Sequence, residues 1–290
     1  MSTTPTTVAV LGLGTMGLPI AVNVRDAGLP TVVWNRTPRP ERALDGLDVA
    51  RTAAEAVARA EIVVTMVSDA AAVLAIARDE GVLAALAPGA VWVQMSTIGV
   101  AGTARLLEHL AAERPDVVLV DAPVSGSEEP ARNGTLTILA SGPESERARL
   151  EPLFDAVGRR TVWVGEAGAG SRMKLVLNSW LALATEAVAS SLSLAHRLGL
   201  ETGLVLEALD GSPLVSGWQA AKLRRIAADD FSAQFALSLA LKDVHLAVDA
   251  AGRGALPTLD ALAGQWQRAV DGGYGDQDLT VVLAALDDGA

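Results

Sequence analysis

The sequence predicts an α/β protein, in which an N-terminal doubly wound parallel sheet is followed by an all-helical C-terminal domain. Three observations support this prediction. Short apolar runs alternate with segments of helical spacing through the first half, and a G-x-G-x-x-G turn joins the first run to the first helical segment. After residue 165 the pattern is helical alone.

The predicted strands are short and consist mainly of Val, Ile and Leu, which is typical of strands buried on both faces of a parallel sheet. They lie at residues 8–11, 31–34, 62–66, 91–95, 117–120, 136–139 and 161–164. Between the earlier strands, helical length and spacing occur at residues 18–27, 53–59 and 73–83. This alternation favours right-handed crossovers and a single sheet with helices on both faces.

The second half begins after a cluster of turn residues at 165–170. Residues 172–198 then read as one helix, about 27 residues and roughly 40 Å long at 1.5 Å per residue. A helix this apolar needs a second domain or a partner subunit to cover it, so we expect at least a dimer. We place one domain at residues 1–166 and the other at residues 167–290.

Composition argues against several classes of function. The net charge is −11 and no basic run occurs, which disfavours nucleic-acid binding. There is no cysteine, and the three histidines lie far apart, so we expect neither a disulfide nor a metal site. The N-terminal segment lacks the pattern of a signal peptide, and polar residues interrupt the most apolar stretch, at 175–198. We therefore expect a cytoplasmic protein without a membrane span.

The glycine-rich turn predicts a Rossmann dinucleotide site, because a strand precedes it and a helical segment follows. Gly12 allows a tight turn, Gly14 allows the pyrophosphate to approach, and Gly17 allows helix and strand to pack closely. The pyrophosphate would lie at the helix N-terminus. The residues predicted to contact the cofactor here are Gly12, Leu13, Gly14, Thr15 and Met16.

The end of the second strand indicates the cofactor preference. Asn35, Arg36 and Thr37 follow this strand, where an NAD site carries Asp or Glu for the ribose hydroxyls. Arg36 can pair with a 2′-phosphate, so the sequence predicts NADPH over NADH, with a solvated loop arginine as the alternative. Loops after two further strands line the same crevice and add Val67, Ser68 and Thr97.

Lys174 is the candidate proton donor. Reduction of a carbonyl by hydride needs an acid near the developing alkoxide, and no Tyr-x-x-x-Lys motif occurs. Lys174 lies in the first turn of the long predicted helix, whose dipole disfavours a cation and so favours release of its proton. Asn178 lies four residues on and shares its face. From spacing alone, a lysine that passes along a core helix fits equally well.

These motifs together resemble the β-hydroxyacid dehydrogenases, relatives of 6-phosphogluconate dehydrogenase, over nearly the whole chain. The matching blocks follow the family's order and spacing. They are Leu11-Gly-Leu-Gly-Thr-Met-Gly17, Met95-Ser-Thr97, Asp121-Ala-Pro-Val-Ser125-Gly126, Gly134-Thr-Leu136, the Lys174/Asn178 helix, Lys242-Asp243-Val-His-Leu-Ala247 and Gly275-Asp276-Gln-Asp278.

The resemblance implies an NADPH-dependent enzyme that interconverts a small aldehyde, 2-oxoacid or semialdehyde with the hydroxyacid or alcohol. Residues 1–166 would be the NADP-binding domain, and residues 167–290 would bind substrate and form a homodimer or homotetramer. It implies roles for seven residues: Lys174 as acid/base, Ser125 and Gly126 on the substrate carboxylate, Thr97 near the nicotinamide, Asn178 and Asp243 toward the substrate, and Lys242 toward the cofactor.

Some details resemble the glyoxylate/succinic semialdehyde reductase subgroup. Ser127 stands where many members have a second glycine, and Phe235 matches a substrate-pocket phenylalanine of the subgroup. Glu128 and Glu129 stand where that subgroup often has lysines, which points to a less anionic or a different substrate. The related imine reductases usually carry Asp or Tyr in place of Lys174. Activity on cyclic imines, or a non-catalytic dinucleotide-binding module, is the alternative function.

Overall fold

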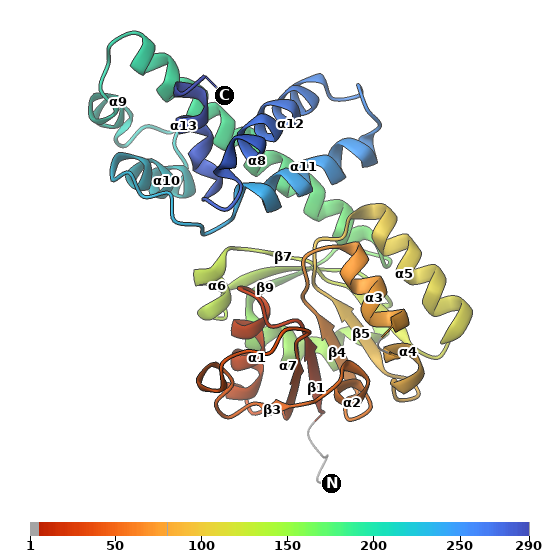
Figure 1. The fold of residues 1–290 in the computed structure, drawn as a ribbon. Helices are drawn as coiled ribbons and strands as arrows, with labels where there is room; N and C mark the ends of the chain where they lie inside the picture. The colour runs from red at the N-terminus through yellow and green to blue at the C-terminus, as the bar shows by residue number, and fades with distance from the viewer. Residues whose placement is uncertain (1–5, 80, 290) are drawn as a thin grey trace. The chain divides into compact units, whose positions relative to one another are not determined.

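The chain divides into two compact units, Met1–Lys174 and Leu175–Ala290. The computed structural model describes residues 6–79 and 81–289. The first unit is an α/β unit built on a parallel sheet, and in the second the described residues form helices joined by loops (Figure 1). The predicted fold class is confirmed.

The main sheet of the first unit has six parallel strands in the order β3-β2-β1-β4-β5-β6. Its strands are β1 (Val8–Leu11), β2 (Thr31–Trp34), β3 (Asp48–Val49), β4 (Ile62–Thr65), β5 (Val91–Gln94) and β6 (Val118–Asp121). The connecting helices are α1 (Gly17–Asp26), α2 (Ala53–Val57), α3 (Ala70–Asp79), α4 (Val82–Ala85) and α5 (Gly99–Glu113). Two further helices complete the unit, α6 (Glu128–Arg132) and α7 (Arg147–Val157).

Alternate residues of each strand pack on opposite faces of this sheet. Val8 and Val10 of β1 pack in one cluster with α1 and α7, whereas Ala9 and Leu11 pack in another with α2 to α5 (Figure 1). All four side chains are fully buried. Burial on both faces explains why these strands are apolar runs rather than alternating ones.

The last predicted strands belong to a separate sheet, which corrects the expectation of a single one. β7 (Val124–Ser125) pairs antiparallel with β8 (Leu136–Ala140), and β8 pairs parallel with β9 (Gly158–Trp163). The two-residue strands β3 and β7 were not predicted, because two residues show no periodicity.

The predicted helix at 73–83 is two helices, α3 and α4. Gly81 stands directly before α4 with φ +67°, a left-handed conformation that interrupts regular helix. Spacing alone did not show the break at this glycine.

The second unit consists of helices packed around α8 (Ala169–Arg197), which starts in the first unit and continues from Leu175. The other helices are α9 (Thr202–Leu209), α10 (Gly217–Ala227), α11 (Leu237–Ala251), α12 (Pro257–Ala269), the π-helix η3 (Val270–Tyr274), the 3-10 helix η4 (Leu279–Val281) and α13 (Val282–Asp287). Trp266 of α12 is fully buried, and its Nε1 donates to Glu186 of α8 at 2.9 Å.

Helix α8 is long and apolar enough to cross a membrane by length and composition alone, and 33% of its most apolar window is buried within the protein. Core helices of folded proteins meet the same criterion. Its large exposed apolar side chains are Val176, Leu177, Trp180, Leu183 and Leu194, and Leu198 follows directly after the helix. All but Leu177 are separated by three, four or eleven residues, spacings that place them along one stripe.

Candidate cofactor and catalytic site

The glycine-rich turn has the backbone that its three glycines predict. Gly12 has φ +98°, and a Cβ there would lie 2.4 Å from the carbonyl oxygen of Met66. A Cβ at Gly17 would lie 1.9 Å from the oxygen of Gly12, so only glycine allows α1 to start this close to β1. A Cβ at Gly14 would meet no atom within 4 Å, which leaves this side of the turn open.

The amino end of α1 suits an anion. Its N-cap residue, Met16, provides no side-chain hydrogen bond to the first-turn amides. Uncapped amides and the positive end of the helix dipole favour a phosphate. Gly14 and Thr15 also line a hollow of about 370 Å³, together with Arg39 and with Arg132, which is paired with Glu128 of the same lining.

Asn35 supports the glycine-rich turn. Its Oδ1 accepts a hydrogen bond from the backbone N of Leu13 at 2.7 Å, and its Nδ2 donates to the carbonyl of Thr37 at 2.6 Å. The side chain therefore ties the end of β2 to the turn after β1, a role that the sequence did not reveal. Arg36, between these anchors, is exposed.

A buried amide supports the next two loops. Gln94, fully buried at the end of β5, accepts from the backbone N of Ser96 at 2.8 Å and donates to the Ser96 carbonyl at 2.7 Å. Ser96 Oγ in turn accepts from the backbone N of Val67 at 2.8 Å. The loops that carry Ser68 and Thr97 are thus joined at the carboxyl edge of the sheet, although the sequence singled out neither Gln94 nor Ser96 as a contact.

The predicted substrate loop lies between β7 and α6. Ser125 pairs with Thr137 of β8, and Ser127 is the N-cap residue of α6. Gly126 has φ +135°, and a Cβ there would lie 2.8 Å from Leu136 and 3.0 Å from Pro130. The glycine therefore sets the shape of this loop whether or not its amide binds a ligand.

The first turn of α8 is fixed to the ends of β6 and β8. Because the helix begins at Ala169 rather than near Arg172, Lys174 lies in its second turn, which corrects the predicted first-turn position. Ser171 N donates to Asp121 Oδ2 at 2.7 Å, and Gly170 N donates to Ser141 Oγ at 2.8 Å. A Cβ at Gly170 would lie 2.2 Å from the carbonyl oxygen of Leu139, so the contact is close. Lys174, half-buried, follows Ser171 by three residues. The first unit thus places Lys174 one helical turn beyond the end of β6.

Within the second unit, Asp243 of α11 organises the remaining predicted residues. It is 4% exposed, accepts from Asn178 Nδ2 of α8 and pairs with Lys242 Nζ at 2.9 Å. Its carboxylate therefore contacts two other candidate residues. Phe235 precedes α11 in a loop, and its backbone N donates to Asp278 Oδ2 at 3.2 Å.

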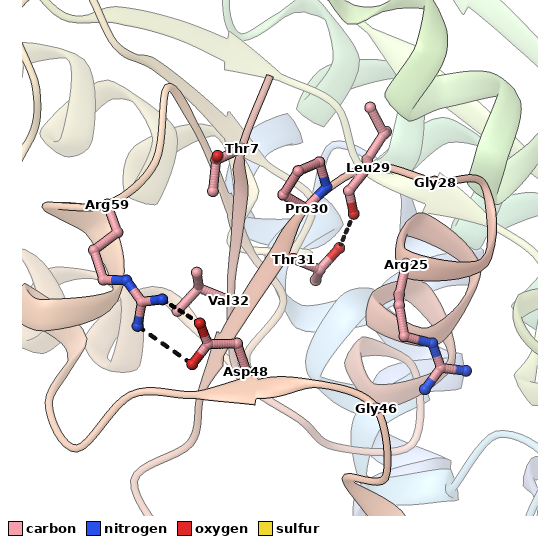
Figure 2. Close-up of a pocket in the computed structure, with 10 residues that line it drawn as sticks. All are labelled: Thr7, Arg25, Gly28, Leu29, Pro30, Thr31, Val32, Gly46, Asp48 and Arg59. Carbon is pink, nitrogen blue, oxygen red and sulfur yellow. Dashed lines mark hydrogen bonds and ion pairs between the residues drawn. The ribbon is translucent and has the colours of Figure 1, made fainter. Parts of the chain in front are cut away.

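A second hollow, of about 510 Å³, lies at the opposite edge of the sheet, by the amino ends of β1, β2 and β3 (Figure 2). Its charged side chains are paired with acidic neighbours: Arg59 with Asp48, and Arg25 with Asp26. The dinucleotide motif lies at the other ends of these strands. In residues 6–79 and 81–289 no cluster of three or more potential metal ligands is found.

Comparison with known proteins gives the family. Residues 7–165 match the NAD-binding domain of 6-phosphogluconate dehydrogenase, and residues 168–286 match the NAD-binding domain of NADP-dependent 3-hydroxyisobutyrate dehydrogenase. The chain belongs to the β-hydroxyacid dehydrogenase family. The resemblance predicted from the motifs is confirmed, and the protein is an NAD(P)-dependent dehydrogenase or reductase of this family.

Individual relatives agree over nearly their whole length. The chain is 30% identical to glyoxylate/succinic semialdehyde reductase 1 of Arabidopsis thaliana, over 96% of this chain and 98% of that protein. It is 32% identical to an NAD-dependent L-serine dehydrogenase of Pseudomonas aeruginosa, over 97% of each. The structure of 3-hydroxyisobutyrate dehydrogenase from Salmonella typhimurium superposes with a TM-score of 0.85 at 28% identity, covering 97% of this chain and 99% of that one.

The predicted relation to imine reductases is also confirmed. The imine reductase from a Pseudomonas species is 25% identical, with a TM-score of 0.60, and covers 98% of this chain and 100% of that one.

Proposed function

We propose that this protein is an NADPH-dependent oxidoreductase that interconverts a small aldehyde, 2-oxoacid or semialdehyde with the corresponding alcohol or hydroxyacid, with Lys174 as general acid and base. The observation that carries the proposal is the anchoring of the Lys174 turn by Asp121. Hydrogen bonds fix this turn to the end of β6, a strand of the sheet whose carboxyl edge also carries the glycine-rich turn. Ligands of open α/β sheets bind at this edge.

The residues of the first unit fit a dinucleotide. Gly14 leaves space for the pyrophosphate, and the uncapped amides of α1 would hold its charge. Val67, Ser68 and Thr97 would lie along the cofactor from the loops that Gln94 and Ser96 join. When bound, the nicotinamide supplies or accepts the hydride.

The protein's own groups would handle the substrate and the proton. The Ser125 hydroxyl and Gly126 amide would hold a substrate carboxylate. In the reductive direction the Lys174 ammonium would donate its proton to the alkoxide oxygen as negative charge develops there. In the oxidative direction the neutral Lys174 amine would take the proton from the substrate hydroxyl.

The preference for NADPH rests on Arg36. It is exposed directly after β2, and the neighbouring Asn35 supplies an amide where an NAD site needs a carboxylate. A guanidinium at this point suits the additional 2′-phosphate. Since one relative is by name NAD-dependent, the preference is a property to measure for this chain.

The charged side chains beside the substrate loop affect which substrates it can bind. Glu128, which follows Ser127, forms an ion pair with Arg132 one turn along α6. Glu129 leaves this short helix acidic at its first turn. Substrates with a single carboxylate, or with an amino group beside it, suit this loop better than dianions, because acidic side chains repel added negative charge. A panel of glyoxylate, succinic semialdehyde, 3-hydroxyisobutyrate, L-serine and a cyclic imine would define the class.

The decisive variant is Lys174→Ala. We expect turnover with the best substrate of the panel to fall by about 10²–10⁴-fold, the usual effect of losing a general acid. Lys174→Arg should be nearly as poor, since a guanidinium does not release its proton near neutral pH. NADPH binding, followed by the change in cofactor fluorescence, should persist because the glycine-rich turn is unchanged.

Arg147→Ala serves as the control for the loss of a cation. Arg147 is exposed on α7 and pairs with Glu144 there, away from the strand ends that carry the motifs. This variant should retain turnover within about twofold, since exposed pairs contribute little. Near-normal turnover by Lys174→Ala would remove the lysine from the mechanism.

We also propose that the protein is a homodimer or homotetramer in which the exposed stripe of α8 is covered by a second copy. Trp180 in this stripe is 79% exposed and Val176 is 63% exposed. Contiguous apolar surface on a soluble helix usually marks an interface.

A further inference from the structure

The amino end of α8 is held by a buried carboxyl group, Asp121, whose protonation state plays no part in the proposed mechanism. Asp121 is fully buried, and its Oδ1 lies 2.8 Å from Ser171 Oγ while its Oδ2 accepts from Ser171 N. Burial raises the pKa of Asp121 to about 6, although hydrogen bonds from Ser171 and the charge of Arg172 oppose the shift. This carboxyl group therefore changes its charge within the ordinary working range of an enzyme.

The hydroxyl groups beside Asp121 continue as a chain. Ser171 Oγ lies 2.9 Å from Thr103 Oγ1, and Thr103 Oγ1 lies 2.9 Å from the Gly99 carbonyl oxygen of α5. Three contacts thus link the carboxyl oxygen, two hydroxyls and a carbonyl, and each contact needs one proton. The hydroxyls supply only two. A neutral Asp121 supplies the third, whereas an ionised Asp121 leaves one contact without a proton.

We propose that Asp121 is a positioning residue for Lys174, and that its neutral form fixes the first turn of α8 by donating to Ser171, which donates to Thr103. This inference rests on the proposed role of Lys174. Lys174 follows Ser171 by three residues, about one helical turn, so a shift of the anchor moves the lysine with it.

The groups that face this carboxyl group determine its response to pH. From α8, Arg172 contributes a positive charge, and Lys174 lies one turn beyond the anchor. From the end of β8, the Ser141 hydroxyl bonds the backbone of Asp121, and α5 contributes Thr103 through Ser171. The latter two groups are neutral, so ionisation adds a negative charge beside the turn that carries Lys174, and Arg172 compensates it only in part.

Two conservative variants shift the proton in opposite ways. Asp121→Asn mimics the neutral carboxyl group, because its amide nitrogen can donate to Ser171 Oγ while its oxygen accepts from Ser171 N. It has no charge to gain. Thr103→Val keeps the shape but removes the acceptor for Ser171, whose proton then returns to Asp121 and favours the ionised form.

Thermal unfolding between pH 5 and pH 8 tests the proton chain without reference to activity. The folded-state pKa lies above the unfolded value of about 3.9, so the stabilisation is complete at low pH and is lost as the pH rises through about 6. The difference in melting temperature between the wild type and Asp121→Asn should show this transition. Thr103→Val should move it downward by about half to one pH unit. A constant difference from pH 5 to 8 would overturn the proton chain.

Steady-state kinetics tests the positioning of Lys174. The kcat of the wild type relative to Asp121→Asn should fall from about 1 near pH 5 to about half or less near pH 8. Asp121→Leu, which cannot make these hydrogen bonds, should lose about 10²-fold in kcat at unchanged KM for NADPH, as expected for a displacement of about 1 Å.

The outcomes separate the two proposals. Restored kcat in Asp121→Asn compared with Asp121→Leu supports positioning, and equal losses in both would overturn it. If Lys174→Ala were fully active, the proposed function would fail, whereas the pH-dependent melting of the Asp121 variants would still report on the proton chain.

Discussion

Breaking the buried ion pair between Lys222 and Asp278 by removing one partner should strongly destabilise the second unit. Lys222 Nζ lies 2.9 Å from both carboxylate oxygens of Asp278 and 3.1 Å from Gln234 Oε1. Asp278 is fully buried and Lys222 is 6% exposed. Burial lowers the pKa of Lys222, whereas the Lys222 ammonium keeps the pKa of Asp278 below its usual range although burial opposes this. The two 2.9 Å contacts of Lys222 Nζ with the carboxylate have the geometry of an ion pair.

Removal of one partner leaves the other buried and uncompensated. In Asp278→Asn the Lys222 ammonium keeps only neutral acceptors, so we expect a loss of about 3–5 kcal/mol in the free energy of unfolding. Lys222→Met should cost less than this, because the carboxylate still accepts from Thr280 and lies 3.7 Å from Arg225 Nη1. At roughly 2–4 °C per kcal/mol for chains of about this size, the Asp278→Asn melting temperature should fall by about 6–20 °C.

Urea titration followed by tryptophan fluorescence measures these changes, because Trp266 is buried in the same unit. The double variant should be more stable than the sum of the single effects predicts, by about 0.5–3 kcal/mol, since each single change leaves a charge that the other removes. Glu144→Gln breaks the exposed pair with Arg147 and should cost about 1 kcal/mol or less. The reasoning would be refuted if the effects of the two single variants simply added in the double variant. It would also be refuted if Asp278→Asn lost no more free energy of unfolding than Glu144→Gln.

Two further predictions concern the cofactor and the assembly. Arg36→Ala should raise the KM for NADPH by about tenfold or more and leave that for NADH nearly unchanged, because a charged hydrogen bond contributes about 1.5–3 kcal/mol; equal use of both cofactors by the unmodified protein would contradict the assignment. Light scattering at micromolar concentration should show an oligomer that Trp180→Glu dissociates, whereas Val49→Glu, at a residue 50% exposed on the edge strand β3, should leave it intact. A monomeric wild type would end this proposal.

Five of the six strands of the main sheet were predictable because both faces of these strands are largely buried, whereas the exposed two-residue strand β3 was not. A continuous apolar run gave β1 and β2 with the bounds that the structure shows. The separation of β8 and β9 into another sheet was not predictable, since it depends on pairing with β7, whose two residues carry no pattern. Strand identity is thus local, whereas the choice of partner strand is not.

In the candidate site, too, features set by local sequence could be predicted, whereas features set by distant partners could not. Glycines at 12 and 17 could be assigned because their geometry excludes a Cβ, and the structure bears out both positions. The supporting roles of Asn35 and Asp243 were missed, since a polar side chain at a strand end or on a helix looks the same whether it binds a ligand or holds its neighbour. Asp278 was quoted only as part of a motif, because its partner Lys222 lies 56 residues away.

Two buried carboxyl groups, one in each unit, anchor the segments that carry candidate reactive residues, and their surroundings give them different chemistry. Asp278 holds the loop of Phe235 and faces the Lys222 ammonium, which keeps the pKa of this carboxyl group below its usual range. Asp121 holds the turn of Lys174 and is surrounded mainly by hydroxyls and amides, so burial prevails and its charge changes near pH 6. The difference follows from the neighbouring cation rather than from the carboxyl group itself. A pH-dependent change in activity that originates from these anchors should therefore come from Asp121 and the Lys174 turn, whereas the Phe235 loop should keep its shape across the same range.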